Sequence, residues 1–298
     1  MTWYEPTSEW LLRLVGWPSV TGSPGERDFA QQLEAALRRW PYFAQHPEAV
    51  WRVPALGGGP ESLLVWVPGT GTQAVLLAGH FDTVGLGSYG PYQGQALDPA
   101  ALRERLLASP ELPAQARQDL QSGVFWPGRG MLDMKAGLAA ALSVLERWVQ
   151  QPRQGHLLLA FSPDEEELSR GIRTARRELA RLTAPQGGGL DLVAALNLDA
   201  TSDQGDGQAG RAVYLGTVGK VMPCVYMVGR PTHAGYPFEG LSAHLLAASV
   251  LRRLENRAEL ADAAHGEAAP PPPAWKAGIS ARPMTSPRPA RSGRPITC

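Results

Sequence analysis

The sequence contains very few cysteines. Among its 298 residues there are only two, Cys224 and Cys298, and they lie far apart in the chain. They can form neither a disulfide framework nor a thiolate metal cage, which is typical of proteins from a reducing compartment. We therefore expect a cytoplasmic protein.

An excess of charge of one sign is also missing. The 28 basic and 28 acidic side chains cancel, so the protein has no overall field that would attract nucleic acid or an anionic membrane. No apolar run approaches the roughly 20 residues of a membrane span. The first charged residues are acidic rather than basic, and the N-terminal segment lacks the long apolar run of a secretion signal. We expect a soluble protein that binds neither nucleic acid nor a membrane.

What the sequence does contain is a regular alternation of apolar runs and amphipathic stretches. Hydrophobic residues make up 44% and charged residues 19%, which is typical of a folded chain. Short apolar runs predict strands over 62–67, 74–78, 157–161 and 192–198, the first two being neighbours joined by a turn at 68–71. Helical spacing predicts helices over 26–40, 98–107, 135–150 and 167–182. This order indicates an α/β fold with a mixed, largely parallel sheet flanked by helices.

The composition and the residue pattern of the sequence change twice along the chain. We expect a first domain over 1–210, followed over 211–267 by the start of a smaller α+β domain with two β-rich runs and a helix at 241–254. Residues 268–298 are rich in proline and arginine and contain no acidic residue, so we expect a disordered or aberrant tail.

Acidic and histidine residues follow the expected strands and a glycine-rich turn. They are His80, Asp82, Asp133, Glu165, Glu166 and Asp199. If the strands are parallel, their carboxyl ends meet at one edge of the sheet, where α/β proteins bind ligands. One imidazole among carboxylates, without cysteine, is a ligand set for zinc or a similar divalent ion, and such ions are often paired through a bridging carboxylate.

Each of these groups also has an ordinary structural interpretation. A histidine and an aspartate two residues apart can follow a strand by chance. The acidic run 164–167 can form the first turn of a helix, where carboxylates complement the dipole. Asp133 can be a helix N-cap, and Asp199 can be a loop former. The common setting of all of them at strand ends or in the glycine-rich turn favours a single site.

Five segments carry a resemblance to a known family: GHFDTV, GRGMLDMKAG, SPDEEELSRG, NLDATS with YLGTVGK, and GRPTHAGYPFEGLSA. Together they resemble the successive signatures of the zinc-dependent amidohydrolase and peptidase family of aminoacylase, glutamate carboxypeptidase, acetylornithine deacetylase and succinyl-diaminopimelate desuccinylase. The resemblance covers about 5–254. The sequence around YLGTVGK and the long segment after GHFDTVG are most similar to the arginine-utilisation, RocB-like branch.

The resemblance implies two divalent metal ions, zinc in the first place, with cobalt or manganese as alternatives. His80 would bind the first ion, with its imidazole oriented by Asp82. Asp133 would bridge both ions, and its peptide bond to Met134 matches a place where the family often has a cis bond. Asp199, often a glutamate in the family, would complete the shell of the first ion.

The remaining implied roles concern catalysis. Glu166 would bind the second ion, while its neighbour Glu165 would act as the general base that takes a proton from water. His233 would belong to a lid and dimerisation domain, reach the active site of a neighbouring subunit and donate a hydrogen bond to the oxyanion. The resemblance thus implies a homodimer that hydrolyses an amide bond in a small N-acyl amino acid or a short peptide.

The sequence departs from the family pattern after the start of the lid. Family chains return to the first domain and supply a final histidine to the second metal, whereas no histidine follows His265 here. We expect a C-terminally truncated chain, in which the residues after about Pro273 are a frameshift product or a natural basic tail. A competing function is therefore an inactive remnant that binds metal weakly. A serine or cysteine hydrolase is disfavoured because no nucleophile elbow is present.

Overall fold

The chain divides into two compact units. The computed structural model describes residues 3–151, 154–200, 213, 225–255 and 257–260. The first unit comprises Met1–Tyr214 and the second Leu215–Cys298. The proline-rich segment expected at 268–298 lies outside the described residues.

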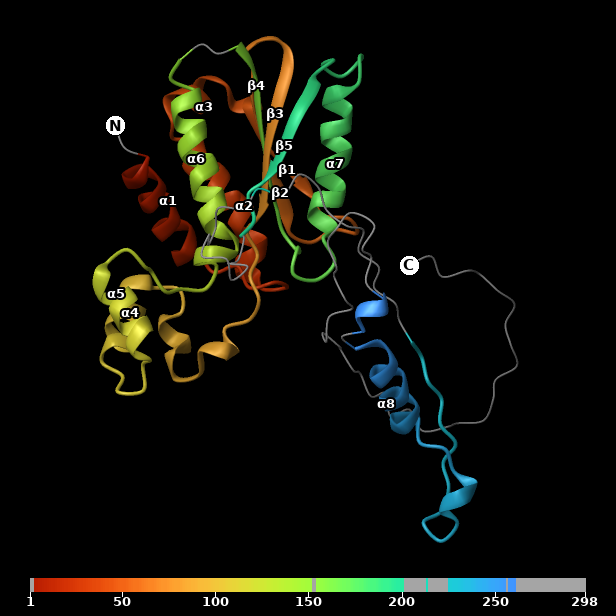
Figure 1. Cartoon of the computed structure of the whole chain (residues 1–298). Helices are drawn as coiled ribbons and strands as arrows, with labels where there is room; N and C mark the ends of the chain where they lie inside the picture. The colour runs from red at the N-terminus through yellow and green to blue at the C-terminus, as the bar shows by residue number, and fades with distance from the viewer. Residues whose placement is uncertain (1–2, 152–153, 201–212, 214–224, 256, 261–298) are drawn as a thin grey trace. The chain divides into compact units, whose positions relative to one another are not determined.

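The first unit is built on a five-stranded mixed sheet in the order β1-β2-β4-β3-β5. The strands are β1 (Val50–Pro54), β2 (Glu61–Val67), β3 (Thr70–His80), β4 (Gln154–Ser162) and β5 (Asp191–Asn197). Strand β3 pairs in parallel with β4 on one side and with β5 on the other (Figure 1). The pairs β1–β2 and β2–β4 are antiparallel. The predicted mixed α/β sheet is confirmed.

The prediction that β2 and β3 are neighbours is wrong, because β4 lies between them. Leu158 of β4 is in register with Trp66 of β2 on one side and with Leu76 of β3 on the other. The run 157–161 is buried along its whole length. A strand that is apolar on both faces is most stable in the interior of a sheet, where helices cover both faces.

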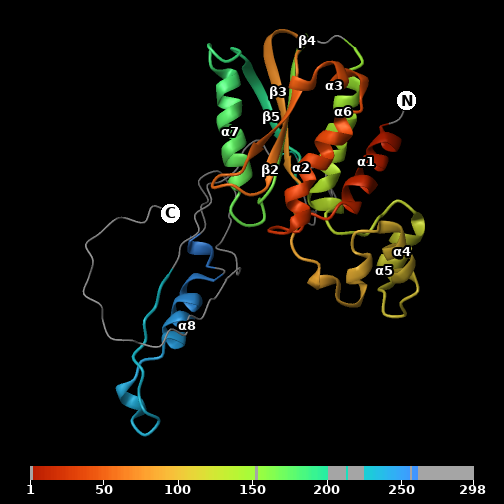
Figure 2. The same cartoon turned by 180° about the vertical axis from the view of Figure 1, so that it is seen from behind.

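Helices cover both faces of the sheet (Figures 1 and 2). One face carries α1 (Tyr4–Gly16), α2 (Pro24–Leu37) and α6 (Ala136–Trp148), and the other carries α7 (Arg170–Thr183). The fully buried side chains of the first layer include Leu14, Phe29, Leu33, Leu138 and Leu142. Each such side chain contributes about 1.5–3 kcal/mol by leaving water. The predicted helices over 26–40, 135–150 and 167–182 are therefore confirmed with shifted ends.

Shorter helices complete the first unit. After β3 the chain forms η2 (Gly87–Gln95), α4 (Pro99–Leu107) and α5 (Ala114–Ser122), and it carries α3 (Pro41–Gln45) and η1 (Pro47–Ala49) ahead of β1. The expected helix at 98–107 is confirmed as α4, whereas α5 was not predicted. Within the described parts of the chain, no helix combines the length and the apolar character that crossing a membrane requires.

The described part of the second unit consists mainly of one helix. It contains α8 (Ala243–Leu254), which confirms the helix expected at 241–254, together with η4 (Pro237–Glu239) and η5 (Ala258–Leu260). Arg230 and Leu241 form an isolated antiparallel bridge. The β-rich runs expected between 211 and 229 lie mostly outside the described residues, and 225–229 is not a strand.

Candidate metal centre

His80 is the last residue of β3 and is buried at the carboxyl end of the three parallel strands. Only 3% of its side chain is exposed. Its Nε2 atom lies 3.1 Å from Oδ1 of Asp133 and 3.9 Å from Oε2 of Glu165. One nitrogen of the imidazole therefore faces two carboxylates that come from distant parts of the sequence.

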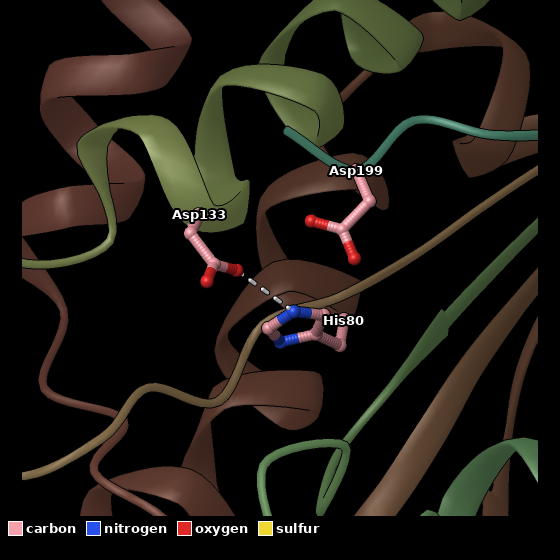
Figure 3. Close-up of side chains that lie close together, drawn as sticks. All are labelled: His80, Asp133 and Asp199. Carbon is pink, nitrogen blue, oxygen red and sulfur yellow. Dashed lines mark ion pairs between the residues drawn. The ribbon is translucent and has the colours of Figure 1, made fainter. Parts of the chain in front are cut away.

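Three of the predicted metal ligands converge at this edge of the sheet (Figure 3). One ligand atom each from His80, Asp133 and Asp199 lies within 4.8 Å of the other two. Asp133 is on η3 (Met131–Lys135), directly before α6, and its peptide bond to Met134 is cis, as the resemblance implied. Asp199 follows the end of β5 by two residues. Parallel strands with helices between them bring these groups together, since their carboxyl ends share one edge.

The orientation of the His80 ring is set from its other nitrogen. Nδ1 lies 3.0 Å from the backbone oxygen of Asp82 and 3.4 Å from its Oδ1 atom. A proton on Nδ1 is therefore donated to Asp82, and Nε2 is directed at Asp133 and Glu165, where it offers its lone pair once its own proton has left. This is the arrangement that a metal-binding histidine requires.

The carboxylate of Asp82 is fully buried and holds the acidic turn that precedes α7. It accepts hydrogen bonds from the backbone N–H of Glu165 at 3.0 Å and of Glu166 at 3.2 Å, and from the hydroxyl of Thr21 at 3.0 Å. Since α7 begins only at Arg170, the acidic run is not the first turn of a helix. The structural interpretation of the run as a helix start is therefore wrong.

Several negatively charged side chains lie around this turn. Burial raises the pKa of Glu166, and the charge of Asp133 raises it further. Glu166 is thus close enough to feel the other carboxylates, although it is not among the three residues whose ligand atoms converge. Burial alone would lower the pKa of His80, but Asp82, Glu165 and Asp199 raise it to about 9. The site attracts positive charge.

Lys135 supports the loop that carries Asp133, a role that the sequence did not reveal. Its side chain is fully buried, and Nζ donates to the backbone oxygens of Leu14 and Trp17 at 2.9 Å each. The ammonium also lies 5.0 Å from the centre of the Phe29 ring. Burial lowers the pKa of Lys135 to about 7. A lysine inside an apolar, glycine-rich stretch was the available signal.

The last predicted site residue, His233, lies in the second unit. Its side chain is exposed, and its Nδ1 accepts a hydrogen bond from the backbone N–H of Gly235 at 3.0 Å. Because the units are described separately, the role expected for His233 stays a prediction.

Comparison with known proteins assigns the family. Residues 107–281 match the family described as Peptidase family M20/M25/M40. The chain belongs to this family.

Three similar proteins and one solved structure give the extent of the likeness. The chain is 38% identical to Bacillus subtilis YqjN over 264 residues, which are 88% of this chain and 48% of that protein. It is 32% identical to RocB of the same organism over 266 residues, 87% and 46% of the two chains. It is also 30% identical to succinyl-diaminopimelate desuccinylase 2 of Shewanella loihica over 132 residues, 43% and 32% of the two chains. A tripeptidase from Staphylococcus aureus is similar with a TM-score of 0.45 and 20% identity, over 84% of this chain and 56% of the other.

The matched regions cover a smaller share of the relatives than of this chain. The chain spans about half the length of YqjN and of RocB. The match to RocB agrees with the resemblance to the RocB-like branch.

Proposed function

We propose that the protein is a metal-dependent hydrolase that cleaves an amide bond in a small N-acyl amino acid or a short peptide. The observation that carries the proposal is the convergence of His80, Asp133 and Asp199 within 4.8 Å. Membership of a peptidase family supports amide chemistry. The name of one relative, a succinyl-diaminopimelate desuccinylase, supports an N-acylated amino compound as the substrate.

Two divalent cations are proposed for this set of donors. His80, Asp133 and Asp199 would hold one ion, and Asp133 with Glu166 would hold the other. A nitrogen donor among carboxylates suits zinc, with cobalt and manganese as alternatives. Burial and the charge of Asp133 raise the pKa of Glu166, and the carboxylates around His80 raise the pKa of its imidazole against the effect of burial. A cation would neutralise the negative charge that contributes to both shifts.

Proton transfer is assigned to Glu165. When bound, a divalent cation supplies Lewis acidity, which lowers the pKa of water and polarises an amide carbonyl. Glu165 has a side chain that is 45% exposed and so can contact both water and substrate. It would take the proton from the attacking water and pass it to the leaving amine. His233 would donate a hydrogen bond to the oxyanion from the partner subunit of a homodimer, as the family resemblance implies.

The experiment uses the full chain loaded with zinc or cobalt. Metal content is measured first, followed by hydrolysis of N-acetyl and N-succinyl amino acids and of dipeptides. We expect Glu165→Gln to abolish turnover while zinc binding remains, because Glu165 moves a proton and does not hold the ion. The control is Glu167, an exposed residue two positions further along the chain. Glu167→Gln should leave turnover unchanged.

The opposite outcome is equally informative. A folded, zinc-loaded chain without turnover on any of these substrates would contradict the proposal. It would favour the alternative, a metal-binding protein that does not catalyse hydrolysis.

A further inference from the structure

Three consecutive backbone N–H groups of the acidic turn donate to buried carboxylates from elsewhere in the chain. The N–H of Asp164 donates to Oε1 of Glu26 at 2.9 Å. The next two, of Glu165 and Glu166, donate to the two oxygens of Asp82. The turn precedes α7, so these three N–H groups take no part in the backbone hydrogen bonds of a helix or a sheet. Its course therefore depends on two carboxylates that lie far away in the sequence.

Glu26 uses both of its oxygens in this arrangement. It lies in the first turn of α2 and is 1% exposed. While Oε1 accepts from Asp164, Oε2 accepts from the backbone N–H of Gly22 at 2.7 Å. Its own N–H donates to Ser23, the N-cap of α2. One carboxylate thus connects the start of α2 with the start of the acidic turn.

The chemistry of its surroundings argues against a merely structural role for Glu26. A buried carboxylate is costly, and it becomes more so beside other carboxylates. Here Glu26 is close enough to Asp82 and Asp164 for their charges to disfavour its ionised form. Asp164 has its own partner in the guanidinium of Arg170, at 2.8 Å, whereas Glu26 accepts from two backbone N–H groups, those of Gly22 and Asp164. Its contacts therefore attach the acidic turn to the start of α2.

We propose that Glu26 is a positioning residue for the metal centre. Together with Asp82, it fixes the backbone of the turn so that the side chain of Glu165 stays beside Nε2 of His80 and that of Glu166 stays beside Asp133. Its effect on hydrolysis rests on the proposed function, since it acts through the proposed base and the proposed ligand. Its effect on the turn does not.

The first test is amide hydrogen exchange of the unmodified full chain without metal. If Glu26 and Asp82 hold the turn, the amides of Asp164, Glu165 and Glu166 exchange at least about tenfold more slowly than in an unstructured peptide. Exchange at the rate of an unstructured peptide would overturn the proposal, whatever the behaviour of any variant.

The second test compares Glu26→Gln with Glu34→Gln. Glutamine has one acceptor oxygen, so it cannot accept from Gly22 and Asp164 together, and the link between the start of α2 and the acidic turn is broken. Exchange at 164–166 should become about tenfold faster, zinc affinity should fall about tenfold or more, and kcat should fall with little change in KM. Glu34 lies on the same helix and pairs with Arg38 and Arg52, so its variant should change none of these quantities.

The outcomes separate the two proposals. Wild-type exchange, zinc affinity and kcat in Glu26→Gln would overturn the positioning role, and so would faster exchange with unchanged zinc affinity and kcat. If the unmodified protein shows no hydrolysis at all, the proposed function fails, while exchange and zinc affinity still decide the role of Glu26.

Discussion

Replacing Asp82 by asparagine tests the central contacts of the site. The carboxylate is fully buried and accepts from Glu165, Glu166 and Thr21. Asparagine keeps the shape but offers only one acceptor oxygen. The hydroxyl of Thr21 can turn and accept instead of donating, whereas one of the two backbone N–H groups loses its partner. A buried donor left without a partner costs about 1–3 kcal/mol.

We therefore expect Asp82→Asn to lower the free energy of unfolding by about 1–3 kcal/mol at pH 7. Zinc affinity should fall about 10–100-fold, because the negative partner of His80 Nδ1 is lost. Urea denaturation of the metal-free chain measures the first quantity, and calorimetric titration with zinc measures the second.

The control is Asp98→Asn. Asp98 is the exposed N-cap of α4 and accepts from the backbone N–H of Ala101 at 3.0 Å. Asparagine is as good an N-cap as aspartate, so neither quantity should change. If Asp82→Asn were as stable as the parent protein and bound zinc equally well, the assignment of these hydrogen bonds would be refuted.

Two further predictions concern pH and packing. Because the pKa of His80 is about 9 in the metal-free protein, zinc must displace its proton at pH 7; affinity measured by titration should rise about tenfold per pH unit and level off above that pKa. The raised pKa of His80 also stabilises the metal-free fold. This contribution is fully present at a pH below the pKa of histidine in the unfolded chain, and it is lost as the pH rises through 9. Gly137→Ala would place a methyl group against the backbone oxygen of Leu198, next to Asp199, so we expect weaker zinc binding and a lower melting temperature. Gly16→Ala meets open space at the end of α1 and serves as its control; zinc binding unaffected by Gly137→Ala would contradict this.

The sequence predicted most of the fold because its apolar spacing is clear. The runs around β3 and β4 and the stripe of α6 reflect burial, which local patterns record. The apolar run of β5 also marks a strand, although its residues are mostly exposed. The order of the strands was not predicted correctly, since β2 and β3 are adjacent in sequence but separated in the sheet by β4. A turn of a few residues permits a hairpin without requiring one, and the choice depends on which strand needs two covered faces.

The candidate site was predicted in the same uneven way. The candidate ligands His80, Asp133 and Asp199 followed from residue type and setting, since His80 and Asp199 come at or after strand ends and Asp133 follows a glycine-rich turn. Glu26, Thr21 and Lys135 were not found, although each contacts the site or its supporting loops.

The sequence by itself determined the fold class and the residue types of the candidate site, because residue type and spacing are local properties. Only the tertiary structure decided which carboxylate accepts which backbone N–H group. Such contacts join distant residues, 83 positions apart for Asp82 and Glu165 and 138 for Glu26 and Asp164. No local pattern records a distance across the fold, and the course of the acidic turn depends on that distance.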